Sequence, residues 1–226
     1  MYNPSVRVHL IDTPGFDDTN LSDVQVPQNI AHWLSASFKS GVRLNGMIFL
    51  HRITDPRLAG SGRRNLLMFK KLCGERAYQS VVLATTMWGR VPLEEGERRE
   101  NELVEKPAYW GSMCKLGSKV FRYHNTRESA LDLVSYIISL HRPVTLDIQD
   151  EIVNKHREID QTAAASELNA EIMAERKRHQ EELKAIQEDM AEAIAAHDEA
   201  LQKQFKDEIG ELQAKISKAD REQVIM

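Results

Sequence analysis

The strongest constraint on this chain is the alternation of short apolar runs with helical patterns over its first 142 residues. Near-continuous apolar strands that alternate with helices are typical of a parallel sheet covered on both faces. The fold class is therefore predicted as α/β, with a mainly parallel sheet and helices on both faces. The predicted strands are 6–11, 46–51, 80–85 and 119–124, and the predicted helices are 27–39, 63–73 and 129–141.

Polar residues lie at the ends of three of these predicted strands. Asp12 directly follows the first strand, Thr85 and Thr86 end the third, and Asn125 follows the fourth. The carboxyl ends of parallel strands meet at one edge of a sheet, where ligands bind in open α/β folds. We therefore expect these four residues to outline a ligand site on that edge.

Asp12 opens the tetrapeptide Asp12-Thr13-Pro14-Gly15, which joins a carboxylate to a tight turn. A carboxylate there can hold Mg²⁺ through water, because magnesium keeps several waters and takes few protein ligands. Gly15 allows the backbone to approach a phosphate, with its N–H directed at a terminal oxygen. The pattern favours a sensor of a γ-phosphate, and an ordinary strand-to-loop turn is the alternative.

Four segments together carry a family resemblance: HLIDTPGFDDT from His9, LNGMIFLHRITDPRLAGSGRRNLLMFKKLCG from Leu44, VVLATTMWG from Val81 and YHNTRESA from Tyr123. In this order they resemble the P-loop GTPases, especially fungal members of the septin-like, immunity-associated (avirulence-induced) branch. The resemblance covers about residues 5–141. It implies a P-loop NTPase-type fold, with GTP or GDP and Mg²⁺ as ligands.

On the phosphate side, the resemblance makes Asp12 the water-mediated magnesium ligand and Gly15 the backbone donor to the γ-phosphate. Thr13 then helps to shape the turn. On the base side, it places Thr85 and Thr86 at the end of a strand beside the base. By the same resemblance, Asn125 approaches the base from the last loop, and Gly89 stands where the family commonly has a guanine-reading acid.

The lysine-bearing phosphate loop of this family, GxxxxGK[ST], is absent from the sequence. Gly41 and Gly46 have the required spacing, but Met47 and Ile48 occupy the Lys and Ser/Thr positions. Without the loop, most electrostatic stabilisation of the phosphates is lost. We expect an incomplete domain without useful GTP hydrolysis. A fragment of a larger GTPase is favoured over a degenerate relative, which remains the alternative.

The chain is predicted to divide into a partial G domain, 1–142, and a long acidic amphipathic helix or coiled coil, 143–226. Residues 150–226 contain 19 acidic and 11 basic residues, and residues 148–224 contain no proline and one glycine. Apolar residues recur every eleven positions, a spacing that predicts a straight or weakly right-handed helix pairing. The two series are Ile172, Leu183, Ile194, Phe205 and Ile216, and Met190, Leu201 and Leu212. We expect 148–224 to self-associate or bind a partner protein.

Other classes of protein are disfavoured by composition. Residues 1–149 carry 19 basic and 15 acidic residues, too small an excess to indicate nucleic-acid binding. No apolar stretch approaches the roughly 20 residues of a transmembrane helix. Cys73 and Cys114 lack metal-ligand spacing and are expected to be reduced thiols in the cytoplasm. The expected function is a guanine-nucleotide-dependent switch or assembly protein, and the alternative is a nonenzymatic GTPase-derived scaffold that uses its coiled coil.

Overall fold

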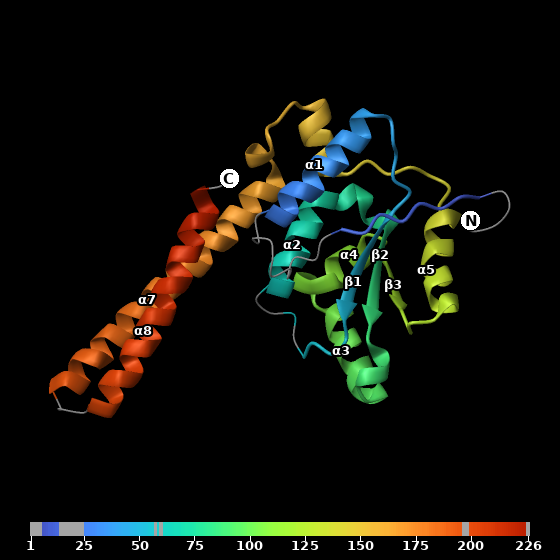
Figure 1. Cartoon of the computed structure of the whole chain (residues 1–226). Coiled ribbons are helices and arrows are strands. Elements are labelled where there is room, and N and C mark those ends of the chain that lie inside the picture. Colours follow the sequence, from blue (N-terminus) through green and yellow to red (C-terminus); the bar gives the residue numbers. More distant parts are fainter. Residues whose placement is uncertain (1–5, 14–24, 57, 59–60, 196–198, 225–226) are drawn as a thin grey trace.

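The computed structural model describes residues 6–13, 25–56, 58, 61–195 and 199–224 (Figure 1). Within these ranges, three strands form one parallel sheet in the order β1-β2-β3. Their bounds are β1 Met47–Arg52, β2 Val81–Thr86 and β3 Lys119–Arg122. Each lies within two residues of a predicted strand. The predicted parallel α/β arrangement is therefore confirmed for these three strands.

The central strand β2 is apolar because both of its faces are covered. Val81 and Leu83 belong to the larger hydrophobic cluster, whereas Val82 and Ala84 belong to a smaller one on the other face. This division follows from the two-residue period of a strand. Helix α5 (Arg127–Ser139) covers the smaller cluster, and α2 (Ser61–Cys73) and α4 (Ser112–Lys115) lie on the side of the larger one (Figure 1). Helices on both faces are thus confirmed.

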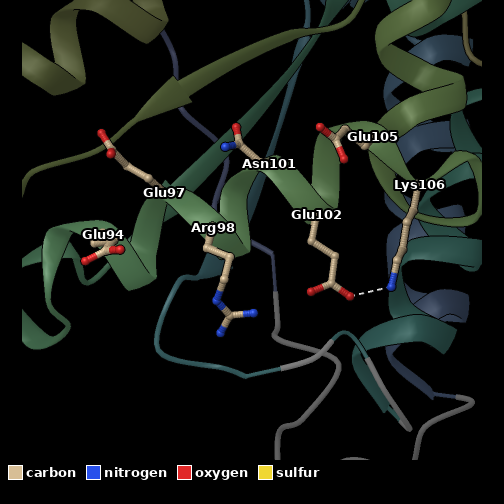
Figure 2. Close-up of a pocket in the computed structure, with 7 residues that line it drawn as sticks. All are labelled: Glu94, Glu97, Arg98, Asn101, Glu102, Glu105 and Lys106. Carbon is tan, nitrogen blue, oxygen red and sulfur yellow. Dashed lines mark hydrogen bonds and ion pairs between the residues drawn. The ribbon is translucent and has the colours of Figure 1, made fainter.

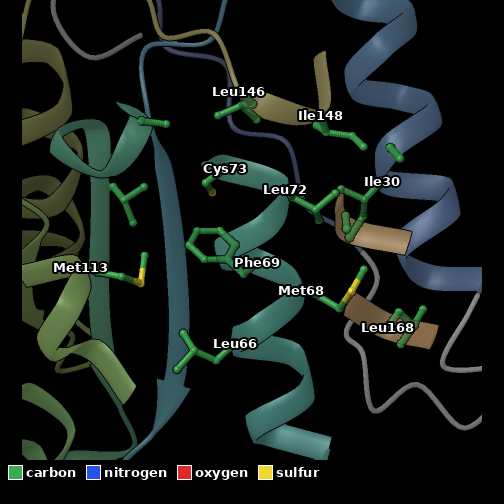
Figure 3. Close-up of a cluster of buried hydrophobic side chains, with 14 of the residues drawn as sticks. Ile30, Leu66, Met68, Phe69, Leu72, Cys73, Met113, Leu146, Ile148 and Leu168 are labelled. Atoms are coloured by element: carbon green, nitrogen blue, oxygen red, sulfur yellow. The ribbon is translucent and has the colours of Figure 1, made fainter. Parts of the chain in front are cut away.

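A further layer of helices packs on the outer side of α2. It consists of α1 (Gln25–Lys39), α6 (Asp147–Gln149) and the start of α7 (Ala163–Ala195). Figure 3 shows Leu72 of α2 close to Ile30 of α1, and Leu168 of α7 below them. Residues 144–172 thus contribute side chains to the same core as the sheet.

The remaining elements connect these layers. Helix α3 (Leu93–Glu105) follows β2 after a short 3₁₀ turn, Trp88–Arg90. Two further 3₁₀ turns are Glu75–Ser80 and Ile159–Gln161, and wider π-type turns are Pro107–Gly111 and Asp150–Asn154. Helix α1 ends where Gly41 adopts a left-handed conformation with φ 83°, which costs little without a Cβ.

The C-terminal extension is helical, as predicted, and its described residues form two long helices. The chain forms α7 and then α8 (Glu199–Val224), which lie side by side and antiparallel (Figure 1). Arg176 pairs with Asp220 at 2.7 Å, and Gln202 Nε2 donates to the carbonyl oxygen of Ala193 at 3.3 Å. Folding back allows apolar residues of α8 to pack against α7, which local helical periodicity alone does not require.

The base of this helical hairpin, defined as α7 and α8, is fixed to α2. Glu167 of α7 pairs with Lys71 at 3.2 Å, and Glu175 pairs with Arg64. Partly exposed ion pairs of this kind contribute at most about 1 kcal/mol each. Burial of Leu168 and Ile172 therefore supplies most of the attachment.

The predicted first strand, 6–11, is not formed. Val6 makes an isolated bridge, and residues 7–13 have no regular secondary structure. The side chains of Leu10 and Ile11 are 74% and 47% exposed. An apolar run becomes a strand only when a neighbouring strand supplies hydrogen-bonding partners, and sequence pattern alone does not provide that neighbour.

Two isoleucines from the same eleven-residue series test how the hairpin is attached. Ile172 is 1% exposed and belongs to the core, whereas Ile194 is 52% exposed. Ile172→Ala should lower the free energy of unfolding by about 3 kcal/mol, because it leaves a cavity in the core. Ile194→Ala should change it by less than about 0.5 kcal/mol. Urea denaturation followed by circular dichroism measures both; equal effects would contradict this packing.

Candidate functional site

The carboxyl edge of the sheet brings together three of the predicted site residues. Thr85 and Thr86 end β2, and Asn125 lies in the loop after β3. The backbone N–H of Tyr123 donates to the Thr85 carbonyl oxygen at 2.8 Å, which ties this loop to the end of β2. Asn125 is exposed and has a left-handed backbone with φ 58°, a conformation that asparagine tolerates better than most residues.

The loop that carries Asn125 is held by the start of α5. The Thr126 hydroxyl accepts from the backbone N–H of Ser129 at 3.2 Å, and the Ser129 hydroxyl accepts from the Thr126 N–H at 3.4 Å. This reciprocal arrangement is a capping box, which satisfies backbone donors at a helix N-terminus. The Tyr123 hydroxyl also donates to Asn125 Oδ1 at 3.3 Å. Asn125 therefore projects from an anchored loop.

The phosphate-side residues are not brought to this edge. Asp12 and Thr13 are exposed and lie in the irregular segment 7–13. Figure 1 shows that segment, in dark blue, near the level where β1 begins, whereas Thr85 and Thr86 are at the ends where strands finish. The expectation that Asp12 follows a strand on the shared edge is wrong. Gly15 lies outside the described residues.

Thr85 is the centre of a buried hydrogen-bond network that the sequence did not reveal. Its hydroxyl is fully buried, donates to Glu100 Oε1 at 2.9 Å and accepts from Trp88 Nε1 at 3.0 Å. Burial of polar groups is tolerated when they are hydrogen-bonded in this way. The Thr85 side chain is consequently engaged with the protein itself, while Thr86 Oγ1 donates to the His51 carbonyl oxygen at 3.3 Å.

Arg122 extends this network across the ends of β2 and β3. Its Nε donates to Glu100 Oε2 at 2.7 Å, and its guanidinium also pairs with Glu97 at 3.2 Å. The Arg122 Cζ lies 4.3 Å from the centre of the Trp88 ring, a favourable cation–π arrangement. Hydrogen bonding to Glu100, more than any other contact, raises the pKa of Arg122.

The position of Trp88 depends on a small residue in α3. A Cβ at Gly96 would lie 2.7 Å from the Trp88 ring, so glycine allows the indole to pack against the helix. Trp88 is 7% exposed, so its indole is packed within the protein and has little surface on which a base could stack. Glu100 and Arg122 were missed because each is an unremarkable charged residue in sequence, and only the fold pairs them.

A separate hollow of about 500 Å³ lies along the exposed side of α3 (Figure 2). Its charged lining comprises four carboxylates, Arg98 and Lys106, and Lys106 pairs with Glu102 on the same helix. The excess of negative charge opposes phosphate binding. This surface therefore does not supply the missing phosphate site.

The described part of the chain contains neither a metal-binding cluster nor a helix that could span a membrane. Among its His, Cys, Asp and Glu residues, no group of three or more is arranged to hold a metal ion. Every helix within the described ranges is too short or too polar to cross a lipid bilayer.

Comparison with protein-family models gives no match, and no significant match appears among curated proteins or solved structures.

Two glutamates on α3 provide a matched test of the Thr85 network. Glu100 is buried and contacts both Thr85 and Arg122, whereas Glu97 is half-exposed and contacts Arg122. Glu100→Ala should lower the free energy of unfolding by about 2 kcal/mol, because the buried Thr85 hydroxyl and the partly buried Arg122 guanidinium both lose a charged hydrogen-bond partner. Glu97→Ala should cost less than about 1 kcal/mol. Chemical denaturation of both variants tests the difference; similar losses would contradict a network centred on Glu100.

His51, near the end of β1, has an electrostatic environment that favours its neutral form. Burial lowers its pKa below the ordinary value of 6.5, Arg52 acts in the same direction, and Asp55 opposes them. Its ring lies edge-on to Trp110 with 6.0 Å between ring centres. The folded protein therefore resists protonation of this imidazole more than the unfolded chain does.

This difference predicts a stability change at mildly acidic pH. Because the folded-state pKa of His51 is depressed, the stability that neutral His51 contributes to the fold is fully present above pH 6.5. That stability is lost as the pH falls through the folded-state pKa. Replacement by a residue that does not titrate, His51→Gln, should flatten this part of the profile. Denaturation of wild type and variant between pH 7.5 and 5 measures it. A wild-type profile no steeper than that of the variant would contradict the depressed pKa.

Proposed function

We propose that this chain contains the base-side part of a GTPase-type guanine-nucleotide domain, joined to a helical hairpin that serves in assembly. The observation that carries the proposal is the convergence of Thr86 and Asn125 at the carboxyl edge of neighbouring parallel strands. Ligands in open α/β sheets bind at that edge. The resemblance of VVLATTMWG and YHNTRESA to base-side motifs adds the expected ligand class.

The loop geometry supports a contact to a base. The capping box and the Tyr123 contacts restrict the loop, so that little ordering is needed when Asn125 meets a ligand. An exposed carboxamide offers both a donor and an acceptor to a purine edge. Gly89 lacks the carboxylate that would favour guanine, so Asn125 and backbone groups would carry the selectivity.

The described residues do not fit a complete magnesium and phosphate site. Asp12 is exposed on an irregular segment, and the sequence contains no GxxxxGK[ST] loop. Among the described residues, no carboxylate, Asp12 included, belongs to a group of side chains arranged to hold a metal ion. We therefore derive no hydrolysis step, and the proposed activity is nucleotide binding with its base-side contacts alone.

A nonenzymatic scaffold is the second candidate, and the Thr85 network specifically favours it. Thr85, Trp88, Glu100 and Arg122 occupy the edge with contacts among themselves. Meanwhile the hairpin exposes Ile194, at 52%, and other apolar side chains that another molecule could cover. In this alternative the α/β part supports the hairpin, and the hairpin mediates self-association or binds a partner protein.

Titration with fluorescent N-methylanthraniloyl-GDP, with and without Mg²⁺, tests nucleotide binding by the full chain. The proposal predicts saturable binding that Asn125→Ala weakens about tenfold, the expected effect of losing one or two hydrogen bonds worth about 1.4 kcal/mol. Asn154→Ala is the control, because Asn154 is an exposed amide in the turn Asp150–Asn154, which packs on α1. Absence of saturable binding, or equal weakening by both variants, would contradict the base-side proposal.

Light scattering on the same preparations distinguishes the scaffold candidate. A mass that rises with protein concentration, together with no nucleotide binding, would support assembly through the hairpin. Nucleotide binding sensitive to Asn125→Ala would support the base-side proposal whether or not the mass changes. A strictly monomeric chain without nucleotide binding would contradict both the nucleotide proposal and scaffolding by self-association.

A further inference from the structure

The helical hairpin buries its own apolar side chains only in part. Figure 1 shows α7 and α8 extending together away from the sheet. A pair of helices covers each apolar side chain from few directions, whereas a four-helix bundle encloses such side chains between facing helices. Six apolar residues of the hairpin are consequently half-buried: Leu183, Ile186, Met190, Phe205, Ile209 and Ile216.

One side of α8 carries four charged residues whose sign changes along the helix. Glu208, Glu211, Lys215 and Lys218 are separated by three or four positions, which places them on the same side of the helix. We call these four residues the charged stripe. The stripe is acidic toward the start of α8 and basic toward its end, so it is complementary to itself when a second copy lies antiparallel.

The charged stripe is accessible to another molecule. Glu211 and Lys215 are exposed, and neither makes an ion pair with any residue that the structure describes. The Lys218 side chain is 60% exposed and pairs with Glu222 on the same helix at 3.5 Å. Glu208 is half-exposed and accepts one hydrogen bond from a glutamine of α8. Because an ammonium has three donors and a carboxylate has about four acceptor positions, both groups can take a second partner.

A two-fold axis beside Gln213 brings the charged stripes of two copies into register. In antiparallel helices related by this axis, Glu211 of one copy faces Lys215 of the other. Glu208 likewise faces Lys218. Each of these pairings occurs twice, because a two-fold contact uses the same surface of both copies.

The rest of α8 agrees with this axis. Over residues 203–223, every charged residue faces either an uncharged residue or one of opposite charge, as Lys206 faces Asp220. Moving the axis to Leu212 would instead set Lys206 against Lys218. Like charges placed against each other oppose association. The charge pattern therefore favours the antiparallel direction and the axis at Gln213.

The charged stripe also runs beside the half-buried apolar residues of α8. Ile209 follows Glu208 in the sequence, and Ile216 follows Lys215. A helix that lies along the stripe therefore covers apolar surface next to it. Exposed ion pairs contribute little free energy individually. Apolar burial thus supplies the affinity, while the charges select the partner and its direction.

From these observations we propose that two copies of this chain pair through their hairpins, with the two α8 helices antiparallel about Gln213. The four helices then form a bundle that covers the half-buried apolar residues. This inference rests on the assembly role proposed above for the hairpin, and it specifies the partner as a second copy. Because a two-fold contact closes on itself, association stops at two chains.

Sedimentation equilibrium of the full chain tests the stoichiometry and the contribution of charge. The average mass should rise with protein concentration from one chain to two. Association should weaken at least about fivefold between about 50 mM and about 500 mM sodium chloride, because salt screens the charged stripes. A mass that continues to rise beyond two chains, or an association unaffected by salt, would overturn the proposed pairing.

Two double variants of opposite charge test the register. Lys215→Glu with Lys218→Glu makes the stripe entirely acidic, and Glu208→Lys with Glu211→Lys makes it entirely basic. Each variant alone should self-associate at least about tenfold more weakly than wild type, because like charges then face one another. An equimolar mixture should recover an affinity within about threefold of wild type, since unlike stripes then meet. Recovery in the mixture also shows that both variants fold.

Lys203→Glu with Arg221→Glu is the matched control, because it makes the same change of net charge as the acidic variant but lies on α8 outside the stripe. It should leave the affinity within about threefold of wild type, since neither position faces a charged residue in the proposed register. Equal weakening by the control and the acidic variant would overturn this interface, and so would a mixture that fails to pair.

These outcomes are distinguishable from failure of the proposed function. Self-association that is insensitive to the charged stripe would overturn the α8 pairing without contradicting assembly through another surface. A strictly monomeric wild-type chain would overturn the pairing and self-association together. Nucleotide titration and its dependence on Asn125 are read separately, because none of the substituted residues lies at the carboxyl edge of the sheet.

Discussion

The side chains of β2 alternate between two hydrophobic clusters, and the layers of the molecule are arranged around this burial. Val81 and Leu83 join the cluster that includes residues of α2, while Val82 and Ala84 join the cluster covered by α5. A parallel strand covered on both faces needs helices on both sides, because neither row of apolar side chains can remain in water at low cost. The carboxyl edge lies where this central strand and its two parallel neighbours end, and the loop after β3 is hydrogen-bonded to it through Tyr123 and Thr85.

At that edge, several polar side chains form hydrogen bonds and ion pairs with one another. The Thr85 hydroxyl, the Glu100 carboxylate and the Arg122 guanidinium form a connected network beside Trp88. Such a network stabilises the ends of β2 and β3, but it also leaves fewer groups for a ligand. Asn125 differs because it is exposed on an anchored loop, and it is the residue on which the proposed nucleotide contact depends.

The C-terminal extension is part of the core before it becomes a projecting hairpin. Ile148 and Leu168 pack with residues of α1 and α2 in the larger hydrophobic cluster. Farther along, the hairpin relies on contacts between α7 and α8, such as the Arg176–Asp220 pair. The extension therefore packs into the core at its start and continues beyond it as two paired helices.

The sequence by itself determined the local elements: three apolar runs became β1, β2 and β3, and the helical patterns became α1, α2 and α5. Strand alternation and helical periodicity indicate which residues share a face that needs burial, because the local geometry of a strand or helix decides which side chains lie on the same side. Only tertiary structure decided that run 6–11 does not join the sheet, that the acidic extension reverses direction, and that Thr85 pairs with Glu100. Those outcomes depend on partners distant in sequence, and a local pattern specifies the need for a partner without identifying it.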